Sequence, residues 1–228
     1  MSTIADNVSQ VDERIRAAAL VAQRDPSTIG LLAVSKTKPA AALREAFAAG
    51  LHDFGENYLQ EALSKQLELA DLPLCWHFIG PIQSNKTRAI AEHFAWVHSV
   101  DRLKIAQRLS EQRPAELPAL NICIQINVSG EASKSGCTPE DLPALAAAIN
   151  LLPRLKLRGL MAIPEPTDDS AAQNAAFAAV SSLQHSLNLP LDTLSMGMSH
   201  DLEAAIAQGA TWVRVGTALF GARDYGQP

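Results

Sequence analysis

Lysine, arginine and small hydroxyl residues follow several short apolar runs in this chain. Lys36 comes just after an apolar run that ends at Val34, and Arg214 lies within another. Two similar Gly/hydroxyl turns, at residues 197–199 and 216–217, occur late in the chain. Partial desolvation at the end of an apolar run lowers the pKa of a lysine, so Lys36 is a candidate amine nucleophile. These residue types indicate covalent amine chemistry beside an anion site.

The two Gly/hydroxyl turns are candidate phosphate-binding segments. Backbone N–H groups approach an anion closely at small residues, and the hydroxyls of Ser199 and Thr217 add donors. The alternative is that these hydroxyls cap the helices that follow them. Asp201 and Glu203 lie in the first turn after Ser199, where they would repel an anion and favour capping. Both interpretations stay open on these residues alone.

Arg214 is expected to point into the protein interior from one face of a strand, because a period of two places it on the same face as Trp212 and Gly216. A buried arginine needs a partner, since an unpaired buried charge is costly. Either a carboxylate such as Glu56 or an acceptor atom of a ligand would serve. With Lys36 nearby, the arrangement suggests a phosphorylated aldehyde held as a Schiff base, of which pyridoxal 5′-phosphate (PLP) is the commonest cofactor. An arginine only donates hydrogen bonds, so it would keep the pyridine nitrogen unprotonated.

The elements that position these residues alternate regularly. A first amphipathic helix has Ile4, Val8, Val11 and Ile15 at helical spacing. Eight apolar runs follow, at 29–34, 52–55, 76–79, 95–98, 121–128, 157–162, 193–196 and 212–215. Each precedes a helical pattern, at 39–49, 58–69, 86–92, 102–111, 140–150, 170–187, 202–208 and 218–220. We therefore predict an α/β chain with one domain over residues 1–228, a (β/α)8 TIM barrel at 28–223 behind a helix within 1–24. A doubly wound sheet would want a Gly-rich first turn, which residues 35–38 lack.

Composition excludes several classes of function. The net charge is −5, from 19 Lys+Arg and 24 Asp+Glu, without a basic cluster, so no nucleic-acid partner is expected. No apolar run approaches the ~20 residues of a membrane span, and the acidic first segment is unlike a signal peptide. The three cysteines form no CxxC pair, which indicates reduced thiols and a cytoplasmic location. There is no HExxH or ligand-spaced His/Cys cluster, so no metal site is predicted.

Six long motifs resemble those of the pyridoxal phosphate homeostasis proteins. They are AVSKTKP (33–39), FGENY (54–58), HFIGPIQSNK (77–86), GLMAIP (159–164), LSMGMS (194–199) and VRVGTALFG (213–221). The likeness runs from about residue 4 to residue 223. It implies a fold type III barrel, related to the N-terminal domain of alanine racemase, with PLP on Lys36 as a Schiff base. The cofactor-binding residues that it implies are Lys36, Asn57, His77, Met161, Ser199, Arg214, Gly216 and Thr217.

The resemblance also implies a role in intracellular vitamin B6 homeostasis, as a PLP buffer or carrier without robust catalysis. PLP-dependent apoenzymes would be its recipients. A racemase needs a second acid/base, often a tyrosine, and the tyrosines here are Tyr58 and Tyr225. The chain ends seven residues after Gly221, which leaves room for the barrel alone and favours a monomer.

Two alternative functions and one further site stay open. The first alternative is a monomeric PLP-dependent racemase or related enzyme. The second is a class I aldolase whose lysine binds a sugar phosphate without a cofactor, although such a lysine usually lies later in the barrel. A second PLP molecule on a surface lysine is also open, the candidates being Lys65, Lys86 and Lys134.

Overall fold

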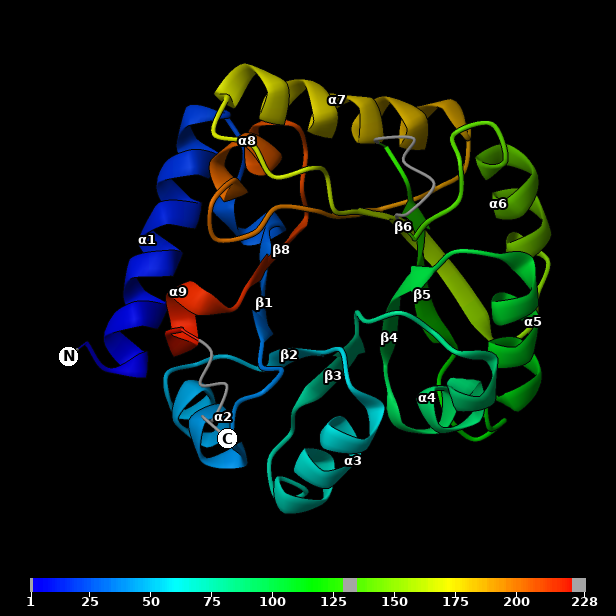
Figure 1. Ribbon diagram of the computed structural model, residues 1–228, viewed down its shortest axis with the longest axis horizontal. Helices are drawn as coiled ribbons and strands as arrows, with labels where there is room; N and C mark the ends of the chain where they lie inside the picture. Colours follow the sequence, from blue (N-terminus) through cyan, green and yellow to red (C-terminus); the bar gives the residue numbers. More distant parts are fainter. Residues whose placement is uncertain (1, 129–134, 223–228) are drawn as a thin grey trace, which may run out of the picture.

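Eight parallel strands close into a ring in the computed structural model, which describes residues 2–128 and 135–222 (Figure 1). The strands are β1 Gly30–Val34, β2 Asp53–Glu56, β3 Cys75–Phe78, β4 Trp96–Val100, β5 Leu120–Ile126, β6 Leu155–Ala162, β7 Thr193–Ser195 and β8 Trp212–Val215. Their order around the ring is their order in the chain, and β1 pairs with both β2 and β8. The predicted (β/α)8 barrel is therefore confirmed.

Helices surround this ring on its outside (Figure 1). They are α1 Ile4–Val21, α2 Ala40–Ala48, α3 Leu59–Glu68, α4 Thr87–His93, α5 Leu103–Gln112, α6 Leu142–Asn150, α7 Ser170–Ser186, α8 Leu202–Ala207 and α9 Thr217–Phe220, with short 3-10 turns at Pro26–Thr28 and Ser84–Lys86. Each helix pattern in the sequence corresponds to one of these helices, with ends that differ by a few residues. In the described ranges, none of them is long and apolar enough to cross a bilayer.

Strand alternation separates an apolar outer layer from a partly polar interior. In β8, Val213 and Val215 are fully buried members of the core between strands and helices. The neighbouring side chain of Trp212 lies inside the barrel, where its ring meets His77 edge-on at 5.2 Å between centroids. His77 also stacks on Trp96, with an angle of 4° between the ring planes. The barrel interior toward the amino ends of the strands is thus filled by aromatic rings. A binding or catalytic site is therefore expected at the carboxyl ends of the strands.

Helix α1 covers the seam where the first and last strands meet. Its buried face includes Val8, Val11 and Ile15, and it packs on α8 and α9. Asn7 Nδ2 donates a hydrogen bond to the backbone oxygen of Leu219 at 2.8 Å. The N-terminal helix is therefore tied directly to the segments that follow β7 and β8.

Candidate functional site

A cavity of about 190 Å³ opens at the carboxyl ends of the barrel strands. Its walls come mainly from the segments after β1, β2, β3, β6, β7 and β8, as the barrel architecture requires. Six of the residues predicted for the site line it: Lys36, Asn57, Ser199, Arg214, Gly216 and Thr217. Apolar side chains of Val34, Ile79, Ile163 and Met198 complete the lining with His200. The structure therefore brings an amine, a guanidinium, two hydroxyls and a carboxamide around one small space.

A buried ionic cluster lies directly behind the segment that carries Lys36. Lys65 Nζ donates to Glu56 Oε1 and to the backbone oxygen of Ser35, both at 2.8 Å. Ser35 Oγ donates to the same carboxylate oxygen at 2.6 Å. Lys65 is only 4% exposed, so its prediction as a surface lysine is wrong: its ammonium is held inside by these acceptors. Burial raises the pKa of Glu56, although Lys65 and Ser35 act in the opposite direction.

The same cluster fixes the turn after Lys36. Glu61 Oε1 accepts from Lys65 Nζ at 2.5 Å and from the backbone N–H of Thr37 at 2.6 Å. Thr37 has a φ of +65°, a conformation that a β-branched residue rarely adopts. The ionic cluster therefore holds both residues that flank Lys36, Ser35 before it and Thr37 after it.

Arg214 is buried beside the cavity and is held by neutral oxygens. Its Nη1 donates to the backbone oxygen and to Oγ of Ser195, and its Nη2 donates to the backbone oxygen of Ala162 at 2.9 Å. The proposed pairing with Glu56 is wrong, because Glu56 points outward to Lys65 on α3 while Arg214 points inward. Burial lowers the pKa of Arg214 to about 10. A cation in this setting favours a ligand that accepts hydrogen bonds.

Neither candidate phosphate hydroxyl caps a helix. The residue that caps α8 is Asp201, two positions after Ser199, and the residue that caps α9 is Gly216, just before Thr217. The capping interpretation of the two hydroxyls is therefore wrong, and both side chains line the cavity.

The acids that follow Ser199 have protein partners. Asp201 Oδ1 accepts from the backbone N–H of Met198 at 2.6 Å. Glu203 forms a two-point pair with Arg14 of α1, at 2.8 and 3.0 Å. Arg14 also donates to the backbone oxygen of Ser199 at 3.0 Å, which ties the segment to α1. The expected repulsion from Glu203 is offset by this arginine.

Two residues predicted for the site, His77 and Met161, do not line the cavity. His77 is fully buried and contacts Asp53 and His98. Met161 is 1% exposed and packs in the interior. Each lies two residues before a residue that does line the cavity, Ile79 and Ile163 respectively. His77 and Met161 therefore share a strand face with a lining residue but lie one step deeper in the barrel.

His200 was not predicted for the site, yet it belongs to the cavity lining. It is an exposed residue next to Ser199, in the turn that leads into α8. Its position one residue after a predicted phosphate contact was the available signal. The apolar lining residues gave no chemical signal in the sequence.

At the opposite end of the barrel, Asp53, Cys75 and His77 gather atoms of metal-binding type within 4.8 Å of one another. The sequence did not predict this group because the register of β2 and β3, which pairs Asp53 with Cys75, brings it together. Burial and the neighbouring Asp53 raise the pKa of Cys75 to about 12, so its thiol stays protonated. Hydrogen-bond contacts of His77 with both neighbours account for the arrangement.

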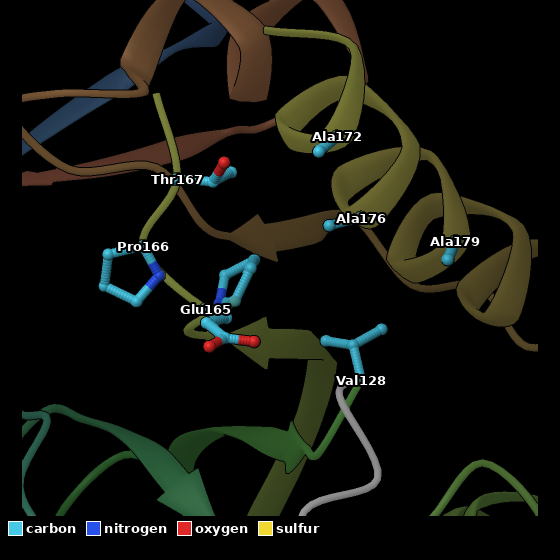
Figure 2. A pocket seen from close by; sticks show the side chains of 8 residues that line it. Val128, Glu165, Pro166, Thr167, Ala172, Ala176 and Ala179 are labelled. Atoms are coloured by element: carbon cyan, nitrogen blue, oxygen red, sulfur yellow. The ribbon is translucent and has the colours of Figure 1, made fainter. Parts of the chain in front are cut away.

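A larger hollow of about 440 Å³ lies between α7 and the loop after β6 (Figure 2). Figure 2 shows the methyl groups of Ala172, Ala176 and Ala179 on the helix side, with Glu165 and Thr167 on the loop side. No lysine or arginine is among its described lining residues. It therefore suits a phosphate less well than the cavity at Lys36, although it is larger.

The residues at Lys36 fit a phosphorylated pyridine aldehyde. Asn57 Oδ1 is buried and has no hydrogen-bond partner among the described residues, as expected for a group that awaits a ligand. An amine, an arginine and two hydroxyls match an aldehyde, a ring nitrogen and a phosphate, while apolar side chains suit the flat ring.

Comparison with known proteins identifies the family. The sequence model described as alanine racemase, N-terminal domain, matches residues 2–224. The chain is 78% identical over 228 residues to the pyridoxal phosphate homeostasis protein of Pseudomonas aeruginosa, covering 100% of this chain and 99% of that protein. It belongs to the pyridoxal phosphate homeostasis protein family. The Escherichia coli K12 family member is 56% identical over 231 residues, covering 99% of both chains. The resemblance seen in the motifs is confirmed.

Solved structures agree with this family and its fold. PipY of Synechococcus elongatus, solved with PLP bound, is 42% identical, with a TM-score of 0.83 over 96% of this chain and 100% of that chain. Alanine racemase from Corynebacterium glutamicum is 18% identical, with a TM-score of 0.69 over 99% of this chain and 62% of that one. The second likeness concerns the barrel fold alone.

Proposed function

We propose that this protein binds PLP covalently through Lys36 and acts in intracellular vitamin B6 homeostasis, as a buffer or carrier of the reactive aldehyde. The observation that carries the proposal is the convergence of Lys36, Arg214 and the hydroxyls of Ser199 and Thr217 on one cavity. PLP bound to the PipY relative supports the same assignment. PLP-dependent apoenzymes are the proposed recipients, and the proposed location is the cytoplasm.

Each lining group has a proposed task. The Lys36 amine attacks the aldehyde carbon and forms an imine, and one water molecule leaves. Ser199, Thr217 and the backbone at Gly216 donate hydrogen bonds to the phosphate. Arg214 donates to the ring nitrogen and keeps it unprotonated, because a guanidinium does not accept a proton. When bound, PLP supplies an electron sink for chemistry at an amino-acid carbon, and an unprotonated ring nitrogen weakens that sink.

A binding role is favoured over turnover by the position of the tyrosine. Tyr58 is 55% exposed and borders a separate hollow with Gln60 and Lys86, not the cavity at Lys36. Tyr225, the other tyrosine of the sequence, lies outside the described residues.

We propose a monomer formed by one PLP-binding barrel domain.

The experiment is to record the near-visible spectrum of purified protein with PLP, reduce it with borohydride, and map the modified lysine by mass spectrometry. An imine band, with the pyridoxyl group on Lys36 and lost in Lys36→Ala, is the expected result. Lys104→Ala, which changes an exposed lysine of α5, is the matched control and should retain the band. A colourless protein, or an adduct on another lysine, would contradict the proposal. In the colourless case, phosphorylated sugars become the ligands to test, as for a class I aldolase.

A second candidate function is a PLP-dependent racemase or related enzyme. The observation in its favour is His200, a candidate second acid/base in the same cavity as Lys36. Turnover of amino acids by the purified protein, abolished in both Lys36→Ala and His200→Ala, would support this function over a carrier role.

A further inference from the structure

Five polar side chains form a continuous hydrogen-bond chain from the amino end of the barrel to the cavity. Arg214 Nη1 contacts Ser195 Oγ at 2.9 Å, and Ser195 Oγ contacts His98 Nδ1 at 2.7 Å. His98 Nε2 then contacts His77 Nδ1 at 2.9 Å. His77 Nε2 contacts Asp53 Oδ1 at 3.0 Å. Each ring nitrogen of the two histidines therefore has a partner in the chain.

This chain crosses the barrel interior rather than following its wall. Asp53, His77 and His98 lie on β2, β3 and β4, whereas Ser195 and Arg214 lie on β7 and β8. His77, His98 and Ser195 are completely buried. Arg214 borders the cavity, and the Asp53 side chain is 30% exposed at the other end. A partly solvated carboxylate is thus linked to the cavity through buried groups alone.

Arg214 determines which atom donates and which accepts in each hydrogen bond of this chain. Because a guanidinium only donates, Ser195 Oγ must accept from Arg214, and the hydroxyl proton of Ser195 is free to go to His98 Nδ1. A neutral His98 that accepts at Nδ1 carries its proton on Nε2 and donates it to His77 Nδ1. His77 then also carries its proton on Nε2 and donates it to Asp53.

The opposite direction fails at Asp53. If His77 donated from Nδ1, its bare Nε2 would face the Asp53 carboxylate oxygen at 3.0 Å, which places two acceptors together. Burial also lowers the pKa of both histidines, which keeps them neutral although Asp53 acts against this at His77. Burial acts to raise the pKa of Asp53, but His77, Cys75 and His52 together lower it, so this carboxyl is an anion that accepts.

We propose that Ser195, His98, His77 and Asp53 are positioning residues that form a one-way hydrogen-bond relay and hold Arg214 as a donor toward the ligand in the cavity. The identity of that ligand rests on the proposed function, but the direction of the relay does not. The relay adds an oriented side-chain acceptor, Ser195 Oγ, to the two backbone oxygens that hold this buried arginine. It also links that arginine to an anion at the far end of the barrel.

The direct test is ¹⁵N-histidine NMR of the protein without PLP at pH 7, which distinguishes the two neutral tautomers. His77 and His98 should both carry their proton on Nε2. Protonation of either ring on Nδ1, or on both nitrogens, would overturn the relay. Because this measurement uses the unmodified protein, it does not depend on any variant folding.

Ser195→Ala tests whether the relay positions Arg214. The substitution should allow His98 to adopt either neutral tautomer. It should also weaken PLP binding about tenfold, the effect of losing about one hydrogen bond to a charged group. Ser110→Ala is the matched control, because Ser110 is also buried, on α5 outside the barrel, and its hydroxyl bonds the backbone oxygen of Pro153. Unchanged PLP affinity in Ser195→Ala would refute the positioning role.

Two further samples separate this proposal from the proposed function. With [¹⁵N]PLP, the pyridine nitrogen should be unprotonated and hydrogen-bonded in the wild type, with a weaker hydrogen bond in Ser195→Ala. Asp53→Ala, at the partly exposed end of the relay, should allow His77 to adopt either neutral tautomer. This variant provides the test if Ser195→Ala does not fold. If Lys36 carries no PLP but both tautomers are as expected, the proposed function fails and the relay stands. If the Lys36 adduct forms but either tautomer is wrong, the relay fails and the proposed function stands.

Discussion

Replacing Lys65 with methionine should strongly destabilise the protein, although Lys65 does not line the cavity. The side chains of Lys65 and Glu56 are 5% and 0% exposed, so water cannot replace the lost ion pair. Removing one partner of such a pair leaves an uncompensated buried charge and costs about 3–5 kcal/mol. In a chain of this size each kcal/mol of lost stability lowers the melting temperature by about 2–4 °C, so this loss corresponds to roughly 6–20 °C.

Urea denaturation at pH 7 measures this loss, with Lys104→Met, a change at an exposed residue of α5, as the matched control that should stay near the wild type. The double variant Lys65→Met/Glu56→Gln should recover much of the stability, because it removes the stranded charge. The deficit of the single variant should also shrink as the pH falls, since the raised pKa of Glu56 lets it become neutral in the folded state. A loss below about 1 kcal/mol, or a double variant no more stable than Lys65→Met, would refute the reasoning.

Three further predictions concern the histidines, a glycine and the phosphate contact. The buried His77 and His98 have pKa values below the 6.5 of the unfolded chain, so their contribution to stability is present above pH 6.5. This stability should be lost as the pH falls, at up to about 1.4 kcal/mol per pH unit for each histidine. Urea denaturation at several pH values measures the loss, which should be smaller in His98→Gln than in the wild type. Gly80→Ala would place a Cβ 2.4 Å from the backbone oxygen of Asn57, so this cavity residue must shift and PLP affinity should fall, as a fluorescence titration would show. Thr217→Val should weaken PLP binding about tenfold but leave binding of pyridoxal, which lacks the phosphate, unchanged; equal losses for both ligands would remove Thr217 from the phosphate site.

The fold could be predicted because each strand and helix has its own local pattern. Apolar runs bounded by polar turns marked all eight strands, and Val8, Val11 and Ile15 marked the buried face of α1. Errors fell at element ends, where tertiary contacts decide. The fifth strand was predicted to continue to residue 128 but ends at Ile126, because the next backbone N–H bonds to the oxygen of Cys137 instead of the sheet.

Residues at the cavity could be predicted where chemistry and strand ends coincide, as at Lys36 and Thr217. Interactions across the barrel could not. His98 and Ser195 meet although 97 positions separate them, and only ring closure determines that contact. Lys65 has the sequence pattern of a solvated helix residue, and its burial depends on acceptors supplied by β2 and the turn after β1.

Closure of the ring by β1 and β8 also sets the time at which the protein can work. Gly30 pairs with Trp212, so β1 keeps one bare edge until a strand 182 residues later has been synthesised. At about 5–20 residues per second, this wait on the ribosome lasts roughly 10–40 s. During that interval Lys36 has been made but the wall that contains Thr217 has not. The nascent chain therefore has no complete pocket, and under the proposed function it could capture the aldehyde only when nearly the whole chain has been translated.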